Sequence, residues 1–182
     1  MSEETIIRGC LRGSAQSQRQ LYDRYAGKMY AVCLRYARST ADAADILQEG
    51  FVKVFTKIHQ FHFQGSFEGW VRRIMVNTAL RTYQRQRFDY EQSGYERLPD
   101  APVDPDAIAT LSEQELLALI AKLPDGYRMV FNLVAVEGYS HAEAAHLLGI
   151  QESTSRSQLT KARRWLVEQV NAQEQFSVGS KH

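Results

Sequence analysis

The chain has 182 residues, 44% of them apolar and 24% charged, which is the composition of a globular protein of one or two domains. It contains no run of about 18 apolar residues, and its first residues do not form a signal peptide, so we expect a cytoplasmic protein without a membrane span. Cys10 and Cys33 lack any CxxC or Cys/His metal spacing, so we expect reduced thiols and no metal or other cofactor.

The net charge of +1 conceals an uneven distribution along the chain. Residues 1–87 hold 14 Lys and Arg against 7 Asp and Glu, a net +7, whereas residues 88–115 hold 1 against 8, a net −7. Residues 116–182 are nearly balanced, with 7 against 6. The basic first segment therefore indicates a polyanionic partner.

Apolar residues at spacings of three and four predict a first helix from Ser14 to Ala37. Its core stripe is expected to contain Leu21, Tyr22, Tyr25, Met29, Val32, Cys33 and Tyr36. A second helix is predicted from about Ala41 to Ile58, with Thr40 as its N-cap. Its inward face would contain Ala43, Ile46, Leu47, Phe51, Val54, Phe55 and Ile58.

The outward face of the second helix is polar and carries Asp42, Asp45, Gln48, Glu49, Lys53 and Lys57. Early acids and late lysines suit the helix dipole, which alone could explain these charges. Gly50 is harder to explain, because glycine in a helix interior costs roughly 1 kcal/mol relative to alanine. We expect Gly50 to permit a close approach by another group beside the acidic residues.

Residues 59–65, with the sequence HQFHFQG, predict a loop rich in aromatic and amide groups. Phe61 is expected to seal the core. For His62, Phe63 and Gln64 two interpretations stay open. They either pack on the core or hold unstacked single-stranded bases, where stacking contributes about 1–3 kcal/mol per base.

A third helix is predicted from its N-cap Ser66 to about Gln86, with Trp70 on its inner side. Its expected buried face contains Val71, Ile74, Met75, Thr78 and Ala79. Polar side chains recur every fourth residue on the other side, at Arg73, Asn77, Arg81 and Arg85. No acidic residue occurs between Glu68 and Asp89. A helix face that only meets solvent usually carries both positive and negative side chains. This pattern favours phosphate binding.

Residues 88–110 contain three prolines and many acids, which predicts an extended linker that repels DNA. A helix at about 111–123 and a further helix from Pro124, closed by Gly138, are expected next. The tail that ends the chain shows no clear pattern.

Residues 137–166 predict two short helices joined by a tight turn. Ser140 and Glu143 form a capping-box pattern, and Gly149 suits the left-handed position that ends a helix. The second helix is expected over about 152–169, packed through Leu159, Ala162, Trp165 and Leu166. Its other face suits phosphates and base edges of the major groove. The alternative is a helical hairpin with a solvated charged face.

Several of these motifs together resemble bacterial sigma factors. Residues 42–51 (DAADILQEGF), residues 65–74 (GSFEGWVRRI) and Asn77 resemble region 2 of that family. Residues 123–127 (LPDGY), with the helix-turn-helix, resemble region 4. With only these two regions, the chain is similar to an extracytoplasmic-function (ECF) sigma factor. The resemblance implies an all-α fold of two small helical domains, with region 2 at 1–87, an acidic linker at 88–110, region 4 at 111–172 and a tail at 173–182.

The resemblance also implies partners and roles. The second predicted helix would dock on the β′ clamp helices of core RNA polymerase through Asp42, Asp45, Gln48 and Glu49. The loop and the arginine-bearing helix would open and capture the −10 promoter strand through His62, Phe63, Gln64, Arg73, Asn77, Arg81 and Arg85. The recognition helix would contact the −35 element through Thr154, Arg156, Ser157, Gln158, Lys161 and Arg163. An anti-sigma factor usually restrains such proteins.

Two positions depart from the family pattern. Ser155 stands where a buried aliphatic residue is common, and Gln158 stands where an arginine is common. His141 and His146 are five residues apart on a short helix, so we expect them to pack or face solvent rather than bind metal.

Two other classes of protein stay open. A stand-alone helix-turn-helix regulator would bind duplex DNA without polymerase. A nuclease or recombinase would need clustered carboxylates or a nucleophile near the basic face. Asp42, Asp45 and Glu49 are the tightest acidic cluster, and they lack a further ligand at metal-binding spacing. We therefore expect no enzymatic activity and no small-molecule substrate.

Overall fold

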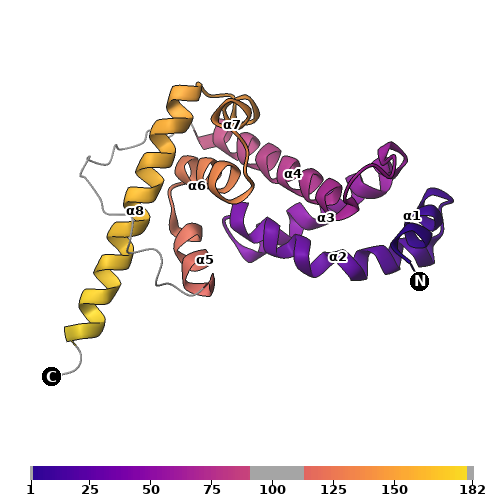
Figure 1. Cartoon of the computed structure of the whole chain (residues 1–182), viewed down its shortest axis with the longest axis horizontal. Helices are drawn as coiled ribbons and strands as arrows, with labels where there is room; N and C mark the ends of the chain where they lie inside the picture. Colours follow the sequence, from indigo (N-terminus) through magenta and orange to yellow (C-terminus); the bar gives the residue numbers. More distant parts are fainter. Residues whose placement is uncertain (1, 91–112, 180–182) are drawn as a thin grey trace. The chain divides into compact units, whose positions relative to one another are not determined.

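The computed structural model describes residues 2–90 and 113–179, with side chains described for 2–85 and 115–172. Every regular element in these ranges is a helix, which confirms the all-α prediction for them (Figure 1). The chain divides into two compact units, Met1–Arg87 and Phe88–His182. No helix in the described ranges is both long and apolar enough to cross a membrane.

The first unit begins with a helix that the sequence analysis missed, α1 (Glu3–Leu11). The hydroxyl of Ser2 caps it by accepting a hydrogen bond from the amide of Thr5 at 3.2 Å. The buried residues of α1 are Ile6, Ile7, Gly9 and Cys10. A serine followed by two glutamates and apolar residues at helical spacing was the available signal.

Glycine allows α1 to pack closely on the next helix, α2 (Ala15–Tyr36). A Cβ atom on Gly9 would lie 2.0 Å from the hydroxyl oxygen of Ser17, so no larger residue fits without a shift of the backbone. The hydroxyl of Ser14, the residue at which this helix was predicted to begin, is the N-cap of α2 and accepts from the amide of Ser17 at 3.3 Å. The core stripe of α2 is also confirmed, except that Tyr22 is 40% exposed at the edge of the core.

Helix α3 (Thr40–Lys57) starts one residue earlier than predicted. Its cap is Ser39, whose hydroxyl accepts from the amide of Asp42 at 3.1 Å, and the prediction of Thr40 as cap was wrong. A Cβ atom on Gly50 would lie 2.2 Å from the sulfur of Met75. The close approach expected at Gly50 is therefore made by the core of the same unit.

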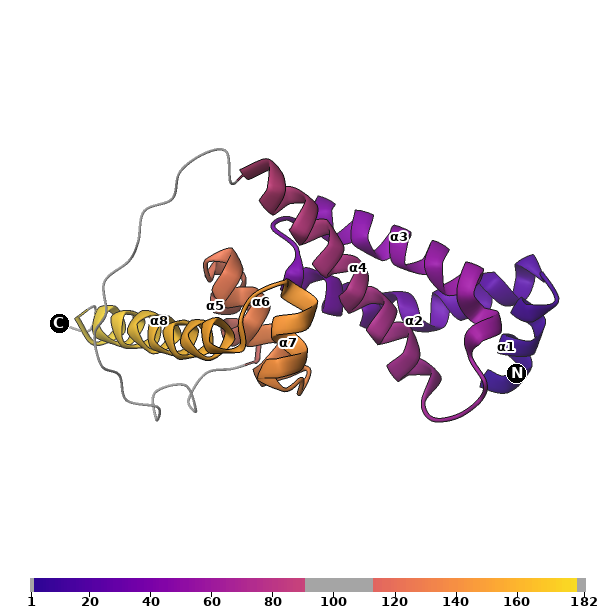
Figure 2. The ribbon, with the colours of Figure 1, turned by 90° about the horizontal axis from the view of Figure 1, so that it is seen from above.

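A short 3₁₀ turn, η1 (Ile58–Gln60), and a loop lead to α4 (Phe67–Tyr90). The hydroxyl of Ser66 accepts from the amide of Gly69 at 3.2 Å, as expected of an N-cap. The buried residues of α4 are Phe67, Val71, Met75, Val76, Thr78, Ala79 and Leu80, whereas Trp70 and Ile74 are half-buried. Residues 88–90 of the expected linker belong to α4, and residues 91–110 lie outside the described ranges. Figure 2 shows α2, α3 and α4 from above.

The second unit contains five described helices: α5 (Glu113–Lys122), α6 (Asp125–Phe131), the π-helical η3 (Asn132–Val136), α7 (His141–Leu148) and α8 (Glu152–Gly179). One core cluster joins α5 to α8 and contains Leu119, Ile120, Leu123, Ala162, Leu166 and Val170. Pro124 is the N-cap of α6 rather than its first helical residue. Helix α8 continues past Gln169 into the expected tail.

The ends of α6 and α7 are fixed by specific polar contacts. Arg128 is only 4% exposed, and it donates to the carbonyl of Ala121 at 3.2 Å and to Asp125 at 3.0 Å, which ties α6 to α5. The capping box of Ser140 and Glu143 is present as predicted. Gly149 has φ 66°, the left-handed conformation expected at the end of α7.

Candidate functional site

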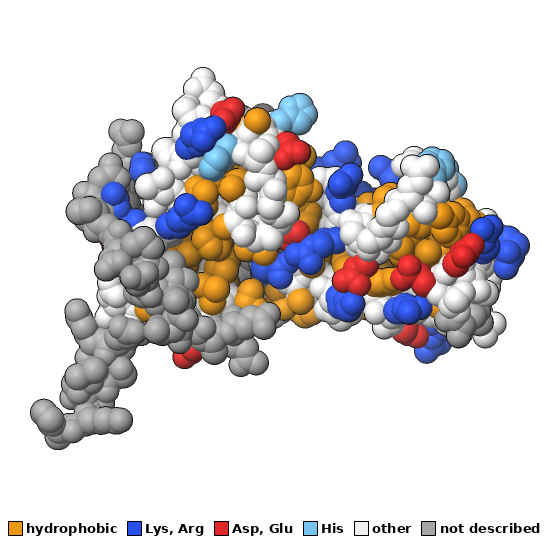
Figure 3. Space-filling model, viewed as in Figure 1, with side chains coloured by type: hydrophobic (Ala, Val, Ile, Leu, Met, Phe, Trp, Pro, Cys, Tyr) orange, Lys and Arg blue, Asp and Glu red, His pale blue; other side chains and the backbone are white. Residues whose placement is uncertain are grey.

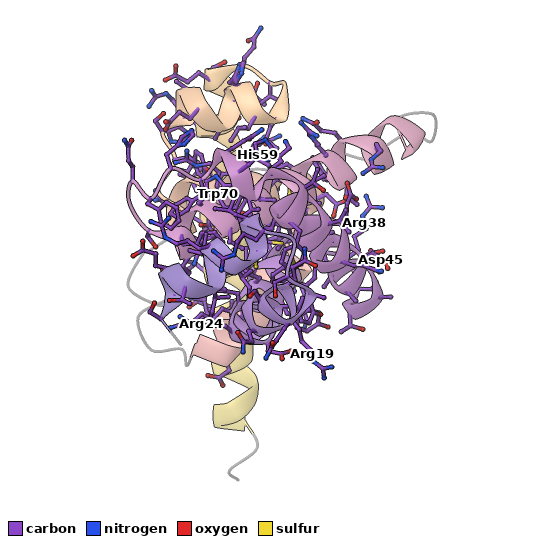
Figure 4. All side chains as sticks on the ribbon, turned by 90° about the vertical axis from the view of Figure 1, so that its right-hand side faces the viewer. Arg19, Arg24, Arg38, Asp45, His59 and Trp70 are labelled. Carbon is purple, nitrogen blue, oxygen red and sulfur yellow. The ribbon has the colours of Figure 1, made fainter. Side chains whose placement is uncertain are left out.

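The outward face of α3 combines carboxylate, amide and apolar groups. Asp45 and Gln48 are exposed, and Asp42 is half-buried. In Figure 4 the side chain of Asp45 lies at the periphery of the unit and points away from it. Val52, two helical turns after Asp45 and 61% exposed, belongs to the same face and was not singled out from the sequence. This face therefore has an apolar group among its polar ones.

Glu49 differs from the other acids of α3 because it bridges to α4. Lys53 donates to Glu49 at 2.6 Å and to the hydroxyl of Thr78 at 3.2 Å. Arg85 lies 3.4 Å from the other carboxylate oxygen of Glu49. The hydrogen bond from Lys53, together with the charges of Lys53 and Arg85, lowers the pKa of Glu49. A residue expected to meet polymerase and one expected to meet DNA are thus paired with each other.

The two phenylalanines in the loop before α4 differ in burial. Phe61 is buried, as expected, and its ring packs on Phe67 with centroids 4.9 Å apart and on Trp70 at 5.7 Å. Phe63 is 40% exposed and has φ 56°, a conformation that non-glycine residues seldom adopt. His62 and Gln64 are exposed. The loop therefore exposes the side chains of His62, Phe63 and Gln64, while Phe61 packs in the aromatic core.

The guanidinium group of Arg8, on α1, lies over the ring of Phe63. Its carbon atom is 5.0 Å from the ring centroid. Arg8 is also paired with Glu4 at 2.7 Å. No pattern in the sequence predicts this contact, because 55 positions separate Arg8 from Phe63 along the chain.

The predicted polar stripe of α4 faces outward. Arg73, Arg81 and Arg85 are exposed, and Asn77 is half-buried. On the face drawn in Figure 3, basic and acidic side chains of the first unit lie next to one another, so the charge there is mixed in sign. Lys28 and Glu68 form an ion pair in this unit, at 2.7 Å.

The residues expected to contact the −35 element lie along the N-terminal half of α8, but not all on one face. Arg156, Ser157 and Arg163 are exposed, whereas Thr154, Gln158 and Lys161 are half-buried. Arg156 is ion-paired with Glu152 one turn earlier. The Gln158 amide packs on the start of α6, since its nitrogen lies 3.2 Å from where a Cβ atom on Gly126 would be. Thr160, which the analysis did not select, is also exposed there.

The thiols and histidines within the described ranges do not form a reactive cluster. Cys10 and Cys33 are buried, and burial raises the pKa of both thiols, that of Cys33 to about 12. Protonated thiols are poor nucleophiles. Among the described residues, no group of three or more His, Cys, Asp and Glu side chains is arranged to hold a metal ion.

Comparison with known protein families gives two matches. The Sigma-70 region 2 model matches residues 21–88, and the Sigma-70 region 4 model matches residues 113–166. The ECF RNA polymerase sigma factor SigE of Mycolicibacterium smegmatis is 30% identical over 152 residues, which cover 81% of this chain and 59% of SigE. SigW of Bacillus subtilis, also an ECF sigma factor, is 27% identical over 90% of this chain and 94% of its own length.

A solved structure shares the fold. The sigma factor RpoE in complex with the anti-sigma factor NepR, from Bartonella quintana, matches with a TM-score of 0.50 and 19% identity, over 82% of this chain and 94% of that one. A helical unit followed by a helix-turn-helix unit, each matched by its own region model, is the arrangement of the Sigma-70 class. Within that class the chain belongs to the ECF family of RNA polymerase sigma factors. The stand-alone regulator is not favoured.

Proposed function

We propose that this protein binds core RNA polymerase in the cytoplasm through the outward face of α3, and directs it to promoters without catalytic chemistry of its own. The observation that carries this proposal is the exposure of Asp45 and Gln48 on the unit whose α4 exposes Arg73, Arg81 and Arg85. Carboxylates repel phosphate, so exposed acids weaken a surface that binds only DNA. A second, protein partner explains why they are present.

The apolar group on the α3 face supports the same interpretation. An exposed valine on a polar helix face makes no contact with phosphate, whereas apolar groups lie at the centre of protein interfaces. Val52 is two turns from Asp45 and 61% exposed. We propose that Val52 is buried in the polymerase complex, with Asp45 and Gln48 beside it.

We propose a division of labour between the two units on promoter DNA. The loop residues His62, Phe63 and Gln64, with the stripe on α4, would hold the melted −10 strand. The exposed residues of α8 would contact the −35 duplex, with Gln158 limited by its packing on Gly126. Each contact set is small, so attachment of both units to polymerase raises their effective concentration at the promoter.

We also propose that an anti-sigma factor restrains this protein. The structure of the Bartonella quintana RpoE contains the anti-sigma factor NepR, and that RpoE shares the fold of this chain. A protein that covers the α3 face would compete directly with polymerase. Such competition needs no change in the fold of either unit.

The direct test is equilibrium binding of the fluorescently labelled full-length protein to core polymerase. The variant D45A/Q48A should bind at least about tenfold more weakly, because a charged and a polar contact are lost together. The matched control is D23A, which removes an exposed carboxylate from α2 instead. Equal affinity of D45A/Q48A and the wild type would remove α3 from the polymerase interface.

A further inference from the structure

Helix α1 places one arginine on the loop that precedes α4. The guanidinium carbon of Arg8 lies 5.0 Å from the centroid of the Phe63 ring. Arg8 donates from Nε and from Nη2 to the same oxygen of Glu4, at 2.9 and 2.7 Å. These two contacts orient the guanidinium group toward Glu4. The side chain of Arg8 is still 56% exposed.

Helix α1, which carries Arg8, is anchored on α2. The phenol of Tyr25 on α2 donates to Glu3, and Gly9 packs directly on Ser17. Helix α1 is therefore held against α2 on two sides of Arg8. An arginine on a rigid helix loses less conformational freedom on binding than one on a mobile segment.

The Phe63 ring has two neighbours. Arg8 lies over it, and Phe61 packs against it with ring centroids 5.4 Å apart. A base that approaches the ring from the side of Arg8 meets the guanidinium first. Guanidinium planes, like aromatic rings, are surfaces on which unpaired bases stack.

We propose that Arg8 stacks on an unpaired base of the promoter strand, so that Phe63, Arg8 and the base form a layered contact. This proposal rests on the proposed function of the first unit in holding melted DNA. It adds a contact from α1, which lies outside residues 21–88 matched by the region 2 model. The exposed side chains of His62 and Gln64 on the same loop can meet the edge of such a base.

The test uses holoenzyme assembled from core polymerase and full-length protein, with single-stranded −10 oligonucleotides whose sequence comes from a promoter that this holoenzyme transcribes. Affinities are measured for the wild type and for R8A, R8K and R12A. Arg12 is also exposed and belongs to the end of α1, so R12A is the matched control for charge. Each variant is measured on the full oligonucleotide and on a series with one base removed at each position.

We expect R8A to weaken binding about tenfold, within the range known for loss of one stacked base. R8K, which keeps the charge but not the plane, should lose nearly as much, whereas R12A should change affinity less than twofold. The penalty of R8A should vanish at one abasic position, because the partner of Arg8 is then already absent. Removal of that base from the wild-type complex should cost about as much as R8A.

Three outcomes would overturn the stacking role: an R8A affinity within twofold of wild type, recovery of most affinity by R8K, or an R8A penalty that persists at every abasic position. The last two would indicate a charge contact to phosphate. Binding of each variant to core polymerase is measured in parallel. If the wild type itself fails to bind core, the proposed function fails, and that result is distinct from any loss confined to Arg8.

Discussion

The Nδ1 atom of His141 lies 2.9 Å from the hydroxyl oxygen of Ser155, and this contact joins the two helices of the helix-turn-helix. Ser155 is completely buried. A buried hydroxyl without a partner costs about 1–3 kcal/mol. His141 supplies that partner, which explains how a serine can occupy this completely buried position. His141 is thus a structural residue that links α7 to α8.

We predict that His141 and Ser155 are energetically coupled. H141A and S155A should each lower the free energy of unfolding by about 1 kcal/mol, and the double variant should lose little more than either. Urea denaturation followed by Trp165 fluorescence, in a W70F background, reports on the second unit. H146A is the control, since His146 is exposed on the same helix. Additive losses would show that the contact contributes nothing.

The packing of α1 on α2 predicts opposite effects for two glycine substitutions. G9A should destabilise the first unit by about 1–3 kcal/mol, because a Cβ atom would lie 2.7 Å from the Cβ of Ser17. G27A should stabilise it by up to about 1 kcal/mol, since Gly27 is exposed in the interior of α2 with no atom within 4 Å of the new Cβ. Denaturation followed by Trp70 fluorescence, in a W165F background, distinguishes them. A stable G9A variant would contradict the position of α1.

The bridge from Glu49 predicts a dependence of stability on pH. The folded pKa of Glu49 is lowered, so its contribution is present above the unfolded pKa and is lost as pH falls through the folded value. E49Q should therefore be less stable than wild type at pH 7 by a few tenths of a kcal/mol, a small value because the carboxylate is partly exposed. Below about pH 4.3 the difference should shrink towards zero. A difference that is unchanged at pH 3 would exclude this bridge as its cause.

Arg81 and Arg85 are expected to contribute mainly electrostatic attraction to promoter DNA. R81A/R85A holoenzyme should bind promoter with a log–log salt slope reduced by about 2, because two phosphate contacts release their counterions. The control is R19A/R24A on α2, whose side chains lie on the other side of the unit from Trp70 in the view of Figure 4. An unchanged slope in R81A/R85A would remove both arginines from the DNA-binding surface.

Local signals in the sequence predicted much of the fold. The caps Ser66 and Ser140 and the left-handed Gly149 are where their residue types predicted, because capping depends on neighbouring residues alone. Helix α1 was missed because its apolar stripe is short. Thr40 was mistaken for a cap because Ser39 beside it offers the same hydroxyl.

Contacts between distant segments were the part that the sequence did not predict. Gly50 indicated a close approach, but not that Met75 makes it. Tyr22 fits the spacing of the α2 core, yet its position at the rim leaves it exposed. The contact of Arg8 with Phe63 and the bridge from Glu49 depend on how helices pack, which spacing within one helix does not determine. The candidate site could therefore be located by element, but its internal pairing could not.

Run-off transcription with core RNA polymerase on a pool of genomic promoters, with and without the protein, tests the central claim most directly. The account predicts discrete start sites that appear only with the wild-type protein and are lost with D45A/Q48A but retained with D23A. Transcription unaffected by D45A/Q48A would contradict the role of α3. Binding of the protein alone to specific duplexes, with no start sites, would contradict the proposal that it acts through polymerase.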